Sequence, residues 1–126
     1  MEDPRIKVFI VDDDKDILQL YSLHFELNGL KIVGTANNGI KAIKKLKNSI
    51  IKPDFIVLDY HMPIINGVET AKIILKIDNS IKIIMISGDS SIKEKALSNG
   101  IIDFHEKTNN IQNLCQKIKE IYNFSI

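Results

Sequence analysis

The sequence predicts an α/β protein built on a parallel, doubly wound sheet of five strands with helices on both faces. Five short runs rich in β-branched or large apolar residues recur along the chain, and a segment of helical periodicity follows each run. Because a parallel crossover needs a connection about as long as a helix, this strict alternation predicts parallel strands.

The five expected strands cover residues 6–11, 30–35, 55–58, 81–86 and 101–104. The third and fourth runs are apolar almost throughout, which is typical of strands that helices cover on both sides. We therefore expect these two strands in the centre of the sheet.

The expected helices cover residues 38–48, 67–77, 91–99 and 109–122, in addition to a first helix that begins after Asp14 and ends at Gly29. The first helix places four large side chains on one face, namely Ile17, Leu20, Tyr21 and Phe25. Ser91, followed three residues later by Glu94, predicts a capping box.

Length and composition predict one globular domain over residues 1–126, with no separate output domain. The chain is 44% hydrophobic and 26% charged, which is ordinary for globular proteins. Arg5 is the only arginine and the net charge is +1, so nucleic acid is not an expected partner. The single cysteine, Cys115, and the lack of a signal or membrane-length apolar segment predict a cytoplasmic protein with no membrane partner.

Acidic residues follow two of the expected strands, with Asp12, Asp13 and Asp14 after the first and Asp59 after the third. In doubly wound sheets, ligands bind beyond the carboxyl ends of the strands. Two carboxylates about 4 Å apart repel by roughly 4 kcal/mol at an effective dielectric constant near 20, and a divalent cation offsets this cost. Carboxylate oxygens and retained water suit Mg²⁺, which also binds phosphate.

Each of these residues also has an ordinary structural interpretation. Acidic residues cap helices, and we accept this interpretation for Asp14. Ser87-Gly88 after the fourth strand resembles a simple turn, and Lys107 after the fifth is one lysine among many. The functional interpretation gains weight because the carboxylates, the hydroxyl and the ammonium all follow expected strands.

Four segments together resemble the response-regulator receiver family of bacteria and archaea, and are similar to its single-domain chemotaxis and sporulation-type members. They are residues 10–14, residues 56–63 with Gly67, residues 84–88, and Gly100 followed by residues 103–107. The likeness covers essentially the whole chain. It implies a flavodoxin-like (βα)5 sandwich with strand order 2-1-3-4-5.

The resemblance implies a role for each candidate site residue. Asp59 is the nucleophile that accepts a phosphoryl group and, together with Asp12, Asp13 and the backbone carbonyl of His61, binds Mg²⁺ as the cofactor. Ser87 binds a phosphate oxygen and Lys107 pairs with the acyl phosphate. Phe104 matches the switch aromatic of the family, which is expected to turn inward when Ser87 moves toward the phosphate.

The implied function is that of a phospho-receiver in a two-component system or phosphorelay, which catalyses its own phosphorylation and dephosphorylation and is otherwise not an enzyme. The expected donor is a histidine kinase or a histidine phosphotransfer protein, docking near Ile17 and Leu18 on the first helix. Phosphorylation is expected to switch the surface of the fourth helix, fifth strand and fifth helix, near Ile92 and Phe104, for a downstream protein target.

The sequence departs from the family pattern at two positions. Thr108 follows Lys107 where the family usually has proline, which leaves the geometry of that peptide open. Ile101 replaces the small residue that usually follows Gly100, so the packing beneath the fourth helix is expected to differ. Neither departure removes a reacting group.

Two alternatives remain. Asp12-x-Asp14 after an apolar strand, with Ser87 and Lys107 as later motifs, also resembles the aspartate-nucleophile phosphatases of the haloacid dehalogenase type. Asp16 stands where that motif usually has Thr or Val, and no carboxylate pair follows Lys107, which argues against it. The second alternative is a receiver-like module that binds a partner without being phosphorylated.

Overall fold

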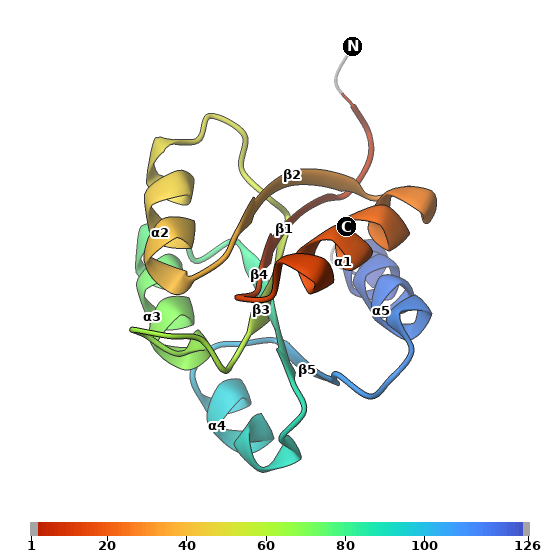
Figure 1. Cartoon of the computed structure of the whole chain (residues 1–126). Coiled ribbons are helices and arrows are strands. Elements are labelled where there is room, and N and C mark those ends of the chain that lie inside the picture. The colour runs from red at the N-terminus through yellow and green to blue at the C-terminus, as the bar shows by residue number, and fades with distance from the viewer. Residues whose placement is uncertain (1–2, 125–126) are drawn as a thin grey trace.

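The computed structural model describes residues 3–124, which form a five-stranded parallel sheet flanked by helices (Figure 1). The strands lie in the order β2-β1-β3-β4-β5, and each neighbouring pair is parallel. The prediction of a doubly wound α/β sheet with this strand order is confirmed. In chain order the elements are β1 (Lys7–Val11), α1 (Lys15–Leu27), β2 (Lys31–Ala36), α2 (Gly39–Asn48), β3 (Phe55–Asp59), α3 (Gly67–Ile77), β4 (Lys82–Ser87), a 3₁₀ turn η1 (Ser90–Ile92), α4 (Lys93–Ser98), β5 (Asp103–Glu106) and α5 (Ile111–Phe124).

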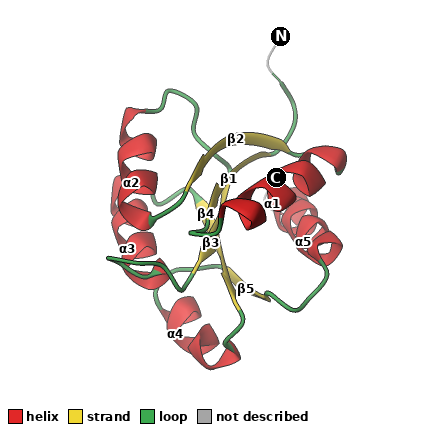
Figure 2. Ribbon diagram, in the orientation of Figure 1, coloured by secondary structure: helices red, strands yellow, loops and turns green. Residues whose placement is uncertain are grey.

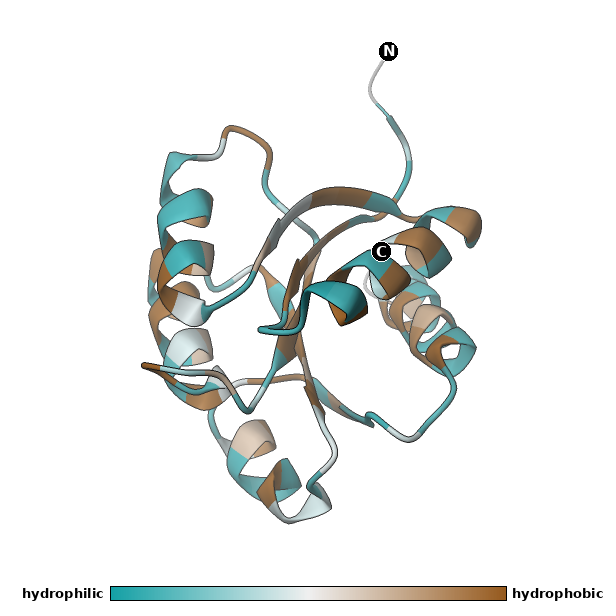
Figure 3. Cartoon of the chain, viewed as in Figure 1, coloured by the Kyte–Doolittle hydropathy of each residue, from teal (hydrophilic) through white to brown (hydrophobic). Residues whose placement is uncertain are grey.

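Helices cover both faces of the sheet, α1 and α5 on one and α2, α3 and α4 on the other (Figure 2). Neighbouring residues of a strand point to opposite faces, so Ile83 joins the cluster under α2, α3 and α4, whereas Ile84 joins the cluster under α1 and α5. Figure 3 shows the hydrophobic strands between helices of mixed character. The strands β3 and β4 are interior, as their apolar sequences predicted.

The ends of α1 are set by residues that the sequence singled out. The Asp14 side chain accepts hydrogen bonds from the backbone N–H groups of Asp16 and Ile17, and therefore caps the helix. Gly29 follows the C-cap with φ of +83°, a left-handed conformation that glycine adopts without strain. Leu20 was predicted on the buried face, but it is 47% exposed, because the buried face runs instead through Tyr21 and Phe25.

Two local predictions were wrong. Asp89, not Ser91, caps the turn η1 by accepting from the Ser91 N–H, and α4 begins only at Lys93 without a side-chain cap. A capping box forms instead at the start of α3, between Asn66 and Glu69. The fifth strand covers Asp103–Glu106 and not residues 101–104, because the apolar residue 101 is buried in the core without being paired in the strand.

Candidate functional site

Polar residues from four strands meet at the carboxyl edge of the sheet. Asp12 follows β1, Asp59 ends β3, Ser87 ends β4 and Lys107 follows β5. Parallel strands all end on the same edge, so the topology alone brings these residues to one side of the molecule.

Three carboxylates form a compact cluster at this edge. One oxygen from each of Asp12, Asp13 and Asp59 lies within 4.8 Å of the others; Asp12 and Asp59 are 2% exposed, whereas Asp13 is exposed. The loop after β1 is held by backbone hydrogen bonds, since the Asp12 N–H donates to the Ala36 carbonyl at 3.1 Å and the Asp14 N–H donates to Asp12 Oδ1 at 3.0 Å. The cluster is therefore fixed by the fold and open to solvent on one side.

The ammonium of Lys107 faces two members of the cluster. Its Nζ lies 3.3 Å from Asp12 Oδ2 and 3.3 Å from Asp59 Oδ1. Its backbone N–H donates to the Ser87 carbonyl at 3.0 Å, which ties the loop after β5 to the end of β4. One positive charge thus stands against three carboxylates, which leaves the cluster with an excess of negative charge.

The ionisation of the cluster follows from burial and crowding. Burial, with the nearby charge of Asp12, raises the pKa of Asp59 from 3.8 to about 6, although Lys107 opposes the shift. Burial also raises the pKa of Asp12, partly offset by the Asp14 N–H and Lys107. Burial alone would lower the pKa of Lys107, but the charges of Asp59 and Asp12 together raise it. Asp59 is therefore mostly a carboxylate at neutral pH, at an energetic cost.

The donor set fits a magnesium ion. Asp59 Oδ1 is buried and has no hydrogen-bond partner among residues 3–124, because the Lys107 ammonium lies at ion-pair distance but outside hydrogen-bond geometry. A buried polar atom without a partner is costly. Carboxylate oxygens beside an exposed Asp13, where water molecules can remain, are the ligands that Mg²⁺ prefers.

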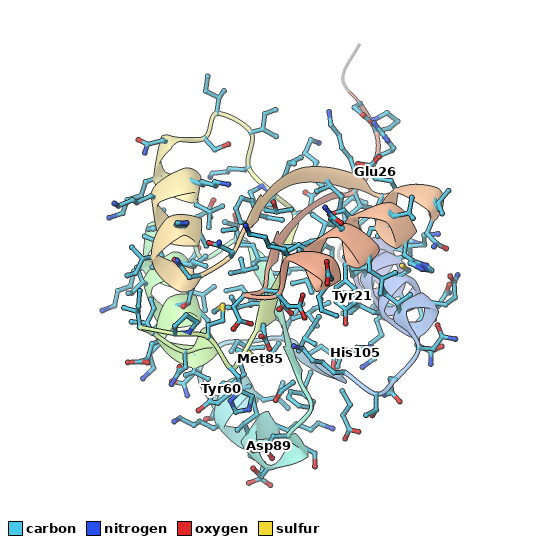
Figure 4. The ribbon with its side chains drawn as sticks, viewed as in Figure 1. Tyr21, Glu26, Tyr60, Met85, Asp89 and His105 are labelled. Carbon is cyan, nitrogen blue, oxygen red and sulfur yellow. The ribbon has the colours of Figure 1, made fainter. Side chains whose placement is uncertain are left out.

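Close packing under Asp59 fixes the loop between β3 and α3. A Cβ atom at Gly67 would lie 2.6 Å from the Asp59 carbonyl oxygen and 2.8 Å from Met85 Sδ and from Tyr60 Cα. The Gly67 N–H donates to the Tyr60 carbonyl at 2.8 Å. Tyr60 and Met85, labelled in Figure 4, lie close together at this position. Only glycine allows this approach, so the position of the acidic residue at the end of β3 depends on it.

Comparison with known proteins identifies this arrangement. The family model described as the response regulator receiver domain matches residues 8–119. The chain belongs to the response regulator receiver domain family. This family match bears out the resemblance that the sequence motifs carried.

The receiver domain is also similar to the regulatory parts of longer proteins. It is 36% identical over 121 residues to a protein-glutamate methylesterase/protein-glutamine glutaminase of Carboxydothermus hydrogenoformans, covering 92% of this chain and 35% of that protein. It is 37% identical over 117 residues to a transcriptional regulatory protein, a CpxR homolog of Haemophilus influenzae, covering 91% and 49%. The chain thus spans about a third to a half of the length of these curated relatives.

Solved receiver structures share the fold closely. The complex of CheX and CheY with BeF₃ and Mg²⁺ from Borrelia burgdorferi superposes with a TM-score of 0.85 at 28% identity, covering 93% of this chain and 89% of that one. The response regulator TrrA of Thermotoga maritima, in complex with Mg²⁺ and BeF, gives a TM-score of 0.81 at 31% identity, covering 90% and 96%. Both of these complexes contain Mg²⁺.

Family membership assigns the receiver domain a phospho-receiver role in two-component signalling. Receiver domains interact with histidine kinases and downstream effectors. Nothing in the comparisons favours the haloacid dehalogenase alternative. Among residues 3–124, no helix combines the length and the apolar character needed to cross a membrane.

The remaining predicted site residues surround the cluster in different ways. Ser87 is fully buried, and its Oγ accepts a hydrogen bond from the Asp89 N–H at 3.0 Å. The His61 ring is exposed and stacks edge-on against Tyr60, with ring centroids 4.9 Å apart. The peptide between Lys107 and the next residue is trans, as are the other peptides of the described chain. The roles predicted for Ser87 and for the His61 carbonyl stay predictions.

The predicted switch and partner residues are less accessible than their roles suggest. Phe104 and Ile92 are buried, 5% and 8% exposed, in one core cluster. Ile17 and Leu18 are half-buried and pack against the cluster under α1 and α5. Their roles also stay predictions.

Two polar residues that the sequence did not single out have side chains that lie on or against β5. His105, one residue after the predicted switch aromatic, is 1% exposed, and burial lowers its pKa. The expected fifth strand ended at residue 104, so His105 was not predicted at an inward-facing strand position. Lys117 donates from α5 to the Phe104 carbonyl at 3.1 Å, a contact that depends on tertiary packing.

Proposed function

We propose that this chain accepts a phosphoryl group on Asp59 from a phosphohistidine donor. A carboxylate oxygen of Asp59 attacks phosphorus, a P–O bond forms as the P–N bond breaks, and the departing imidazole takes up a proton. The supporting observation is the buried Asp59 Oδ1, which has no hydrogen-bond partner among the described residues while it lies within ion-pair distance of Lys107 and beside Asp12 and Asp13.

The chain's own residues prepare this transfer. Asp12, Asp13, Asp59 and the His61 carbonyl would hold Mg²⁺, which when bound neutralises charge on the phosphoryl oxygens. Lys107 offers a positive charge to a phosphoryl oxygen and is already held within 3.3 Å of Asp59 Oδ1. A pKa near 6 keeps most Asp59 side chains deprotonated at neutral pH, which the nucleophile requires.

The hydroxyl of Ser87 links the site to the proposed output surface. Its Oγ accepts from the Asp89 N–H, and Asp89 caps the turn η1 that carries Ile92. Ile92 and Phe104 belong to the same core cluster. If Ser87 turns to donate to a phosphoryl oxygen, Asp89 and η1 are expected to move with it, and the packing around Phe104 changes. We propose that this alters the α4-β5-α5 surface for a downstream target.

The donor is proposed to be a histidine kinase or a histidine phosphotransfer protein that docks beside the acidic cluster. The first turn of α1 follows directly after Asp12 and Asp13 and carries the half-buried Ile17 and Leu18. These side chains give a donor protein an apolar contact next to the nucleophile.

Mass spectrometry of the intact protein tests the proposal. With Mg²⁺ and a small phosphodonor, the wild type is expected to gain the mass of one phosphoryl group, and Asp59→Asn is expected to gain none. Asp14→Asn is the matched control, because asparagine also caps a helix and Asp14 lies outside the metal cluster. Equal labelling of Asp59→Asn, or steady phosphatase turnover that depends on Asp12 but not on Asp59, would refute it.

A further inference from the structure

A basic hollow lies beside the acidic cluster, between the start of α1, the end of β2 and α2. Its volume is about 240 Å³, and three of its lining residues are lysines, namely Lys15, Lys41 and Lys45. Ala36 lines the same hollow, and its carbonyl accepts the hydrogen bond from the Asp12 N–H. The hollow is therefore adjacent to the acidic cluster but is made of different residues.

The three lysines are not neutralised locally. Within residues 3–124, no carboxylate forms an ion pair with Lys15, Lys41 or Lys45. The Lys45 ammonium donates to the Thr35 carbonyl at 2.6 Å, which holds its charge at the wall of the hollow. A concave surface lined by one sign of charge concentrates the field and attracts ions of opposite charge.

Two further features of the lining favour a ligand. Asn37 Oδ1 is buried and has no hydrogen-bond partner among the described residues, so a ligand that keeps one protonated oxygen, such as a partly protonated phosphate group, would satisfy it. The next residue, Asn38, caps α2, so the positive end of the helix dipole also lies at this end of the hollow.

We propose that the hollow binds a small anion with two or more negative charges on phosphate or carboxylate groups. Its volume is below the roughly 300–1,000 Å³ of sites for drug-sized ligands, which suits a compact anion. Three ammonium groups match a multiply charged species better than a single carboxylate. The inference goes beyond the proposed function, since none of these lysines holds the metal or the phosphoryl group there.

NMR titration of the metal-free protein at low ionic strength tests the proposal, with pyrophosphate in one arm and citrate in the other. Without metal, the acidic cluster has no cation that could hold an anion, so saturable shifts around the hollow report binding there. Saturable shifts are expected at the backbone amides of Lys15, Asn37 and Lys41. The two arms show whether phosphate or carboxylate groups bind more tightly.

Charge-removing variants locate the site. Lys41→Gln and Lys45→Gln are each expected to weaken binding about fivefold, the loss of one ammonium contact of about 1 kcal/mol at a solvated position. Lys44→Gln is the matched control, because Lys44 is exposed on the same helix and does not line the hollow. Equal weakening by Lys44→Gln, or the absence of saturable shifts, would overturn the anion site. Neither result bears on Mg²⁺-dependent labelling of Asp59, so the two proposals fail separately.

Discussion

The two edges of the sheet shift the pKa of an aspartate in opposite directions. At the amino edge, Asp78 follows α3, forms an ion pair with Lys52 at 2.5 Å and accepts a hydrogen bond from the Ser80 hydroxyl at 2.6 Å, and these contacts lower the pKa of Asp78 to about 2. At the carboxyl edge, burial and the charge of Asp12 raise the pKa of Asp59 to about 6. The surroundings of Asp78 stabilise its ionised form, whereas the surroundings of Asp59 destabilise its ionised form.

This difference distinguishes a charged group that stabilises the fold from a charged group that is available to a ligand. A paired carboxylate at the amino edge favours the folded state, whereas the buried cluster at the carboxyl edge opposes it. A carboxyl group whose pKa is raised by burial and by a neighbouring carboxylate, as for Asp59, is a candidate for ligand chemistry. The comparison therefore predicts that removing the charge of Asp59 and removing the charge of Asp78 change the free energy of unfolding in opposite directions.

The packing that fixes the carboxyl edge gives the largest expected effect. Gly67→Ala is expected to lower the free energy of unfolding by about 3 kcal/mol, because the added Cβ would overlap the Asp59 carbonyl oxygen and Met85 Sδ. Gly88→Ala is the control at the same edge, since a Cβ there meets nothing within 4 Å. Urea denaturation measures both, and an equal loss from both variants would contradict the packing argument.

Charge removal tests the comparison directly. In metal-free buffer at pH 7, Asp59→Asn is expected to raise the free energy of unfolding by about 2 kcal/mol, because one pKa unit corresponds to about 1.4 kcal/mol and solvent reduces the full effect. Lys107 keeps its contact with Asp12 in this variant. Asp78→Asn is expected to lower the same quantity by less than about 1 kcal/mol, since Lys52 is largely exposed. Urea denaturation showing the same sign for both variants would remove the distinction between the edges.

The pH dependence gives a smaller but more specific signature. The folded-state pKa of Asp59 is raised from 3.8 to about 6, so the folded protein binds a proton on Asp59 more tightly than the unfolded chain does. The resulting stabilisation of the folded state is complete below pH 3.8 and is lost as pH rises through 6. The lowered pKa of Asp78 gives the opposite dependence, with stability present above pH 3.8 and lost as pH falls toward 2. Subtracting the Asp59→Asn unfolding free energy from that of the wild type should leave a difference that falls by about 1 kcal/mol between pH 5 and pH 7. A difference in unfolding free energy that does not change between pH 5 and pH 7 would contradict the raised pKa of Asp59.

Much of the fold was predictable because short sequence patterns identified the strands and the ends of the first helix. The apolar runs marked the interior strands, and Asp14 and Gly29 marked the ends of α1. The alternation of strand and helix then brought Asp12, Asp59 and Lys107 to one edge without further information.

The details that the sequence did not predict depend on which of several neighbouring residues caps a turn, or on contacts between elements that are distant in the sequence. Asp89 and not Ser91 is the cap, because Asp89 directly precedes the turn η1. The helical periodicity placed Leu20 next to the buried face of α1 but did not predict that its side chain is exposed. The three lysines of the hollow lie on two helices, and only packing brings them together.

The most direct test is the free energy of unfolding of the wild type at pH 7 with increasing MgCl₂, compared with KCl at matched ionic strength. If a cation relieves repulsion among Asp12, Asp13 and Asp59, Mg²⁺ should stabilise the protein by about 1.4 kcal/mol at ten times its dissociation constant, and KCl should not. An unfolding free energy that responds equally to MgCl₂ and KCl would contradict the account.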